Sequence, residues 1–163
     1  MATGVTFAPS AQRVADAAAG LGLDIEVRSF PEGTRTAEDA ARAIGVTVGQ
    51  IVKSLVFLAD AQPIVCLVSG ANRVDTFRFA AAVGASKITI ADASAVREAT
   101  GYAAGGVPPF GHAHMLPLYC DRDLLAFDVV WAAAGTPVSV FSVEPTSLVA
   151  ACNATVVDLK VAS

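Results

Sequence analysis

The sequence predicts an α+β fold in which helices flank a mixed, curved β-sheet. The chain has 163 residues, 54% of them hydrophobic and 16% charged, which is enough to bury one sizeable core. β-rich runs and helix-like segments are mixed without a regular βαβ alternation, which favours a mixed sheet. Neither an internal repeat nor a long linker divides the sequence. We therefore expect a single domain spanning residues 1–163.

The N-terminal part of the chain contains two helical patterns around one strand. Residues 10–20 place apolar side chains at helical spacing and end at glycine. Residues 24–30 alternate polar and apolar side chains, which predicts a strand with one solvent-facing side. Thr36 begins a sequence that resembles a capping box, and the helix that it starts should end at Gly45.

Strand patterns dominate the middle of the chain. Residues 51–59 and 63–69 are rich in β-branched side chains and lie three residues apart, which predicts a hairpin. Residues 75–83 have a helical pattern, and residues 87–90 form a short predicted strand. The remaining predicted elements are a helix at 94–100 with Ser94 as its N-cap, strands at 116–120, 127–132, 138–143 and 155–159, a helical turn from Asp121, and a helix at 145–151 that begins with proline.

Lys53 interrupts the apolar run from Ile51 to Leu58. Both faces of this run are largely apolar, so the strand is expected to lie centrally in the sheet. Burying an ammonium group costs on the order of several kcal/mol unless the charge is paired or reaches a cleft. Two interpretations follow: a functional lysine in a cleft, or a lysine whose stem covers apolar surface while its head reaches water.

A loop rich in glycine and proline follows about fifty residues later, at residues 101–111. Its glycines allow close approach of the backbone to a ligand, and its prolines restrict the chain. The alternative interpretation is a tight connection between two elements. The loop has neither the GK[ST] ending of a P-loop nor the GxGxxG pattern of a dinucleotide site.

Lys53 in its strand, the loop at 101–111 and the following Leu116-Pro117 together resemble the YbaK family. These free-standing aminoacyl-tRNA deacylases are similar to the editing domain inserted in bacterial prolyl-tRNA synthetase. The resemblance extends from Ile25 to Asp158, and the GxxxP element of the family matches at Gly105 and Pro109. It implies the same α+β fold and cleavage of an aminoacyl ester on the acceptor end of tRNA.

The resemblance also implies roles for individual residues. Lys53 would contact the terminal nucleotide and, with Gly105 and Pro109, make up the catalytic set. None of these is an obvious nucleophile, so we expect positioning and oxyanion stabilisation, with water or a substrate group attacking and with neither metal nor cofactor. The residues expected to bind the substrate are Phe30 at the pocket mouth, Gly106, Val107 and Pro108 in the loop, and Ser69, whose place after a central strand puts it at the same cleft.

Two segments differ from the family pattern. Cysteine-specific members carry a Ser-Gly-Gly turn and an aspartate in the strand that follows, whereas this chain has Ala-Ala-Ala-Gly-Thr at 132–136 and Val-Ser-Val-Phe at 138–141. Members often place lysines after the loop, where this chain has His112 and His114. We interpret these histidines as surface or RNA-contacting residues rather than metal ligands, because no carboxylate or cysteine lies close to them in sequence.

Other features indicate the compartment and the partners. Cys66, Cys120 and Cys152 form no CxxC pair, which is typical of reduced thiols, and we expect Cys66 and Trp131 in the core. No apolar run is long enough for a membrane helix, and residues 1–9 lack the pattern of a secretory signal, so we expect a cytoplasmic protein. The net charge of −4 argues against a protein that coats nucleic acid.

The expected function is therefore trans-editing: hydrolysis of a small noncognate amino acid, alanine or cysteine, from tRNA(Pro). The partners would be an aminoacyl-tRNA acceptor end and a synthetase. The alternative is a non-catalytic module that binds an acceptor end, a nucleotide or a protein.

Overall fold

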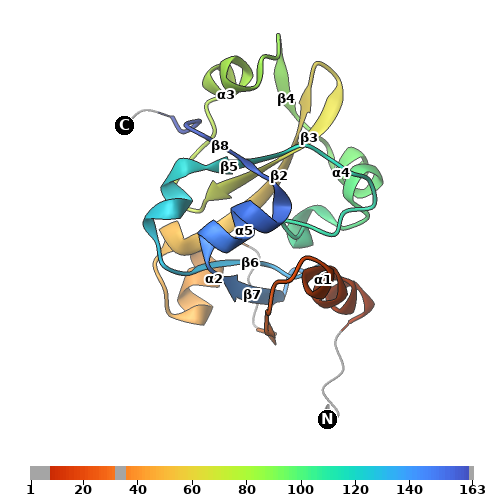
Figure 1. The fold of residues 1–163 in the computed structure, drawn as a ribbon, viewed down its shortest axis with the longest axis vertical. Coiled ribbons are helices and arrows are strands. Elements are labelled where there is room, and N and C mark those ends of the chain that lie inside the picture. The colour runs from red at the N-terminus through yellow and green to blue at the C-terminus, as the bar shows by residue number, and fades with distance from the viewer. Residues whose placement is uncertain (1–7, 32–35, 162–163) are drawn as a thin grey trace.

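Eight strands form one mixed sheet in a computed structural model that describes residues 8–31 and 36–161 (Figure 1). Most of the segment on which the secretory-signal expectation rests, residues 1–7, lies outside the described residues. The strands run in the order β1-β7-β6-β2-β3-β5-β8, and β4 pairs with β2. Their bounds are Val27–Ser29 (β1), Ile51–Ala59 (β2), Gln62–Ser69 (β3), Ile88–Ile90 (β4), Leu118–Asp121 (β5), Val130–Ala133 (β6), Ser139–Val143 (β7) and Thr155–Val157 (β8).

Helices cover both faces of this sheet, which confirms the α+β class. Side chains of α1, α4 and α5 pack in one core cluster with Val52 and Val56 of β2. Phe79 of α3 packs on the other face with Phe57, and the alanines of α2 pack there against Ile51. The α-helices span Pro9–Gly20 (α1), Ala37–Ile44 (α2), Thr76–Val83 (α3), Ala93–Thr100 (α4) and Pro145–Cys152 (α5), and short 3-10 helices span Val48–Gln50, Ala104–Gly106 and Arg122–Ala126.

The central position predicted for the strand that carries Lys53 is confirmed. β2 pairs antiparallel with β3 along its whole length, from Val52↔Ser69 to Ala59↔Gln62. Asp60 and Ala61 alone form the turn, both at positive φ, as in the type I′ turns that favour two-residue hairpins. This turn is one residue shorter than predicted, because Gln62 joins the ladder.

Several predicted boundaries need correction. The strand expected at 24–30 is only three residues long, because only Val27–Ser29 have a pairing partner, β7. Asp92, not Ser94, caps α4: its carboxylate accepts the backbone N–H of Ala95 at 2.8 Å. The Thr36 cap is confirmed, since its hydroxyl oxygen accepts the N–H of Asp39 at 3.0 Å.

Within the described ranges, no helix has the length and apolar character needed to cross a membrane.

Candidate functional site

A pocket of about 350 Å³ lies beside β2, along the edge that pairs with β6 at one end and with β4 at the other. β6 pairs with β2 only at Ile51 and Val52, and β4 pairs with it only from Phe57 to Ala59. Between these ladders, the first half of β2 borders the pocket. The other lining residues come from the N-terminal end of α2, the turn after β3, the glycine-proline loop and β6–β7: Thr36, Ala37, Glu38, Ala40, Gly70, Ala104, Gly105, Val107, Trp131, Ala132, Ala133, Thr136, Pro137 and Val140.

Lys53 lines this pocket, and its ammonium group donates a hydrogen bond of 2.7 Å to the backbone carbonyl of Asn72. Burial lowers the pKa of Lys53, while the carboxylates of Glu38 and Asp121 raise it and Arg73 lowers it further. The side chain is half-buried, and its hydrogen-bond acceptor is an uncharged backbone carbonyl. Among the described residues, Lys53 forms no ion pair that would neutralise its positive charge. A charge held in this way remains available to an anionic ligand.

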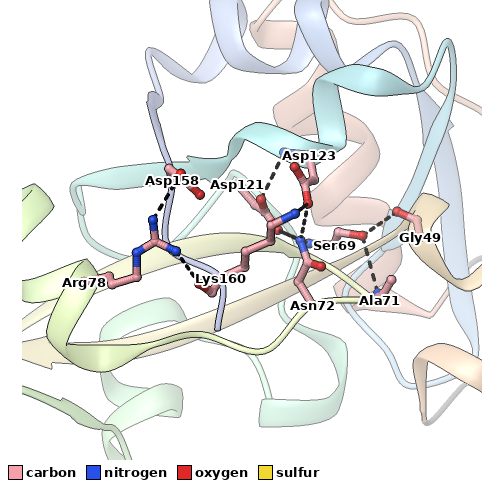
Figure 2. A network of polar contacts seen from close by, with 9 residues as sticks. All are labelled: Gly49, Ser69, Ala71, Asn72, Arg78, Asp121, Asp123, Asp158 and Lys160. Atoms are coloured by element: carbon pink, nitrogen blue, oxygen red, sulfur yellow. Dashed lines mark hydrogen bonds and ion pairs between the residues drawn. The ribbon is translucent and has the colours of Figure 1, made fainter. Parts of the chain in front are cut away.

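The acceptor for Lys53 belongs to a turn that polar contacts hold in place. Asp121, at the end of β5, accepts the backbone N–H of Ser69 at 3.1 Å and the side-chain amide of Asn72 at 2.8 Å. The same amide donates to Asp123, which Lys160 also contacts at 2.8 Å. Figure 2 shows these side chains converging between the ends of β3 and β5. Asp121 is 2% exposed, so this carboxylate is buried and satisfied by donors.

The glycine-proline loop contributes residues from its middle to the pocket. Gly105 and Val107 line it, while Pro108 and Pro109 are buried behind it. Gly106 packs against the backbone of residues 135–136, where a Cβ would lie 2.8 Å from Thr136. Its N–H donates to the carbonyl of Ala103, so this N–H already has a partner. Of these two adjacent glycines, Gly105 therefore lines the pocket and Gly106 is required for the close packing of the loop.

Phe30 and Ser69 lie outside the set of residues that line the pocket. Phe30 is half-buried and its N–H donates to the carbonyl of Val138 beside β7. Ser69 is buried, and its hydroxyl donates to the carbonyl of Gly49 at 2.7 Å. Its neighbour Gly70 reaches the pocket instead, which agrees with the expectation that this turn borders the cleft.

The pocket contains further residues that were not expected there from the sequence, among them Glu38, Trp131 and Ser54. Glu38 looks like an ordinary acidic residue in the first turn of a helix, yet it lines the pocket near Lys53. Trp131 was expected in the core, but it is only half-buried, lines the pocket, and has Arg28 5.5 Å from its ring centre. Ser54 also lines the pocket, and its buried hydroxyl has no hydrogen-bond partner within the described structure. In the sequence, the only sign of a role for Ser54 is that it is a polar residue within an apolar strand.

The backbone of Ser54 is also directed toward the pocket edge of β2. Peptide groups alternate in direction along a strand, and the carbonyl of Val56 accepts the N–H of Ala91 beside β4. Two residues earlier, the N–H and C=O of Ser54 must therefore point to the same edge, in the gap between β6 and β4. A ligand in the pocket would meet the ammonium group of Lys53 together with the backbone N–H and C=O of Ser54.

The histidines and cysteines lie elsewhere. Nε2 of His112 lies 2.7 Å from the backbone carbonyl oxygen of Pro108. Because a carbonyl only accepts hydrogen bonds, Nε2 must carry the proton. This histidine therefore supports the loop rather than projecting from the surface. Burial lowers the pKa of His112. His114 borders a different pocket. Cys66 is fully buried, as predicted, and burial raises the pKa of the Cys120 thiol to about 12, so neither provides a reactive thiolate at neutral pH.

Comparison with known proteins agrees with this geometry. Residues 31–151 match the model of the aminoacyl-tRNA editing domain. A proline–tRNA ligase of Desulforamulus reducens is 33% identical over 104 residues, which make up 64% of this chain and 18% of that longer enzyme. EbsC of Enterococcus faecalis, a candidate Cys-tRNA(Pro)/Cys-tRNA(Cys) deacylase, is 25% identical over 126 residues, 77% of each chain.

A solved structure extends the comparison to the fold. The crystal structure of a candidate trans-editing enzyme for prolyl-tRNA synthetase superposes with a TM-score of 0.91 at 46% identity, covering 96% of this chain and 100% of that one. The resemblance to the YbaK type, first seen in Lys53 and the loop, is thereby confirmed. The chain belongs to the family of aminoacyl-tRNA editing domains and is an aminoacyl-tRNA deacylase.

Proposed function

We propose that this chain acts in trans on tRNA(Pro) and hydrolyses the ester of a small noncognate amino acid, alanine or cysteine. The observation that carries the proposal is that Lys53 and Gly105 line the same pocket. The ammonium group suits a phosphate of the terminal nucleotide, and the nearby walls of alanine and valine suit a small side chain. The relatives whose names refer to tRNA(Pro) or to prolyl-tRNA synthetase support tRNA(Pro) as the substrate. We expect this activity in the cytoplasm.

The proposed reaction is an ordinary ester hydrolysis. Water adds to the carbonyl carbon of the aminoacyl ester, the bond to the ribose oxygen breaks, and the proton from water passes to that leaving oxygen. The products are the free amino acid and intact tRNA. Lys53 holds the acceptor end, and the strand edge at Ser54 and the backbone at Gly105 orient the ester. Glu38 also lines the pocket, and its carboxylate is the group that we propose contacts the α-ammonium group of the amino acid.

Ser54 provides a test that separates function from stability. An unpaired buried hydroxyl lowers stability by about 1–3 kcal/mol, so Ser54→Ala should leave the melting temperature unchanged or raise it. If the hydroxyl binds substrate, loss of one hydrogen bond should lower kcat/KM by about 3- to 10-fold. Thermal melts and deacylation rates would be measured together, with the exposed Ser94→Ala in α4 as the control. Unchanged kcat/KM in Ser54→Ala would exclude this contact.

The amino acid is identified by a panel of tRNA(Pro) charged with alanine, cysteine, serine or proline. We expect rapid loss of the alanyl or cysteinyl ester and protection of prolyl-tRNA, because an editing enzyme that also hydrolysed the cognate ester would deplete prolyl-tRNA. By the family resemblance, cysteine-specific members carry a serine in the turn at 132–136 and an aspartate in the strand that follows. This chain has neither the serine at 132–136 nor an aspartate at 138–141, which favours alanine. Equal hydrolysis of all four esters would contradict the proposed specificity.

The alternative expected from the sequence is a non-catalytic binding module. Its support is limited to the missing serine, aspartate and loop lysines, whereas the match to the editing domain supports an enzyme. The binding module predicts retention of charged tRNA on the protein without ester loss.

A further inference from the structure

We propose that Asp121 and Asn72 are positioning residues for Lys53: the buried carboxylate fixes the turn at residues 69–72 so that the Asn72 carbonyl holds the lysine ammonium group at the pocket. This inference rests on the proposed function, because Lys53 is the residue that it places. Neither residue is among those that line the pocket. Their effect on the reaction would therefore pass through Lys53.

The first step of the argument is the arrangement of donors around Asp121. Its two oxygens accept three hydrogen bonds, from the N–H of Ser69 at 3.1 Å, the amide of Asn72 at 2.8 Å and the N–H of Asp123 at 3.0 Å. Two of these donors belong to the turn after β3, and the third follows β5. Burying a carboxylate is costly unless such donors surround it, and in this case they join the ends of two adjacent strands (Figure 2).

The second step is the rigidity of the turn. The N–H of Asn72 donates to the carbonyl of Ser69 at 2.9 Å, and the N–H of Gly70 donates to the carbonyl of Ile51 at 2.7 Å. The N–H of Ala71 contacts the Ser69 hydroxyl at 3.4 Å. These bonds fix the direction of the Asn72 carbonyl, which receives the Lys53 ammonium group at 2.7 Å.

The third step is electrostatic. The charged groups that act on Lys53 are Glu38 from α2, Asp121 from β5 and Arg73 from the end of the turn. Burial is the largest effect and lowers the pKa of Lys53, whereas the two carboxylates raise it. Asp121 therefore helps to keep the lysine protonated as well as placed, although the two charges are not in direct contact in the described structure.

Reactivity of the Lys53 amine tests the proposal without relying on catalysis. Acetic anhydride labels only the deprotonated amine, and peptide mass spectrometry gives the extent of labelling of Lys53 against pH. In Asp121→Asn the lost charge should shift the Lys53 labelling curve to lower pH. In Asn72→Ala, which keeps the backbone carbonyl but removes both side-chain anchors, labelling should rise because the turn loosens. In both variants kcat/KM should fall by about 10-fold or more.

Asp60→Asn is the matched control. The Asp60 carboxylate likewise accepts backbone N–H groups, those of Ser86 and Lys87, but it does so at the distant hairpin turn. It should change neither the labelling of Lys53 nor the deacylation rate. Thermal melts identify any variant that does not fold, and the milder Asn72→Ala then decides the question.

The outcomes distinguish the positioning role of Asp121 and Asn72 from the proposed function. Wild-type labelling curves in folded Asp121→Asn and Asn72→Ala would overturn the positioning role, whatever the activity. Shifted curves combined with lower kcat/KM support it. Shifted curves in a protein whose wild type hydrolyses no ester would support the placement of Lys53 and overturn the proposed function alone.

Discussion

Lys53→Ala is expected to reduce deacylation by on the order of 100-fold or more while the protein stays folded. The ammonium group is the side-chain cation that lines the described pocket, and losing a charged anchor for the substrate costs about 2–5 kcal/mol in comparable cases. Stability should hardly change. Burial lowers the pKa of Lys53, so the folded state binds its proton less tightly than the unfolded state does, and this side chain contributes little favourable energy when charged.

The same pKa shift gives the expected pH dependence. Because the pKa of Lys53 is lower in the folded protein, stability should rise with pH as Lys53 loses its proton, while the anchoring charge is lost. Deacylation corrected for spontaneous hydrolysis should therefore decline at alkaline pH, below the usual range of a lysine. Lys87→Ala, at an exposed lysine beside β4, is the control. A folded Lys53→Ala with wild-type rates would remove Lys53 from the mechanism.

Two adjacent glycines of the loop should respond in opposite ways to alanine. At Gly105 a Cβ would meet only Pro137, at 3.8 Å, which is ordinary contact. Gly105→Ala should therefore keep the melting temperature, and the added methyl group at the pocket wall should lower kcat/KM by on the order of 10-fold. At Gly106 a Cβ would lie 2.8 Å from backbone atoms of Thr136. Gly106→Ala should therefore destabilise the fold by about 1–3 kcal/mol.

Each variant is the control for the other. Denaturant unfolding gives the change in stability, and single-turnover hydrolysis of alanyl-tRNA(Pro) gives the change in rate. If Gly105→Ala lost stability and kept its rate, the assignment of this glycine to the pocket would be wrong. If Gly106→Ala were as stable as wild type, the close approach of the loop to residues 135–136 would not constrain the fold.

Local patterns predicted most of the fold. The β2–β3 hairpin and the helices ended by Gly45 and Gly101 depend on residues close in sequence, and both glycines adopt the positive φ expected at a helix end. The strand at 24–30 was overpredicted because alternation reports side-chain direction but not the length of a partner strand. Asp92 was missed as the cap because Ser94, two residues later, is also a favourable N-cap residue type.

The site could be predicted from the sequence only where the polarity of a residue differed from that of its neighbours. Lys53 stood out because an ammonium group in an apolar strand needs an explanation. Glu38 did not, since an acidic residue in a first helical turn is already explained by the helix dipole. Asp121 and Asn72 are 49 residues apart, and only the parallel pairing of β3 with β5 brings them together. The contrast between Gly105 and Gly106 likewise depends on residues 135–136.

The measurement that tests the central claim most directly is multiple-turnover hydrolysis of alanyl- and cysteinyl-tRNA(Pro) by the free chain, with substrate in large excess over enzyme. A trans-acting deacylase releases many equivalents of one amino acid per protein molecule, and Lys53→Ala should nearly abolish this release. Stoichiometric binding of the charged tRNA, with ester loss no faster than in buffer, would contradict the account and favour the binding module.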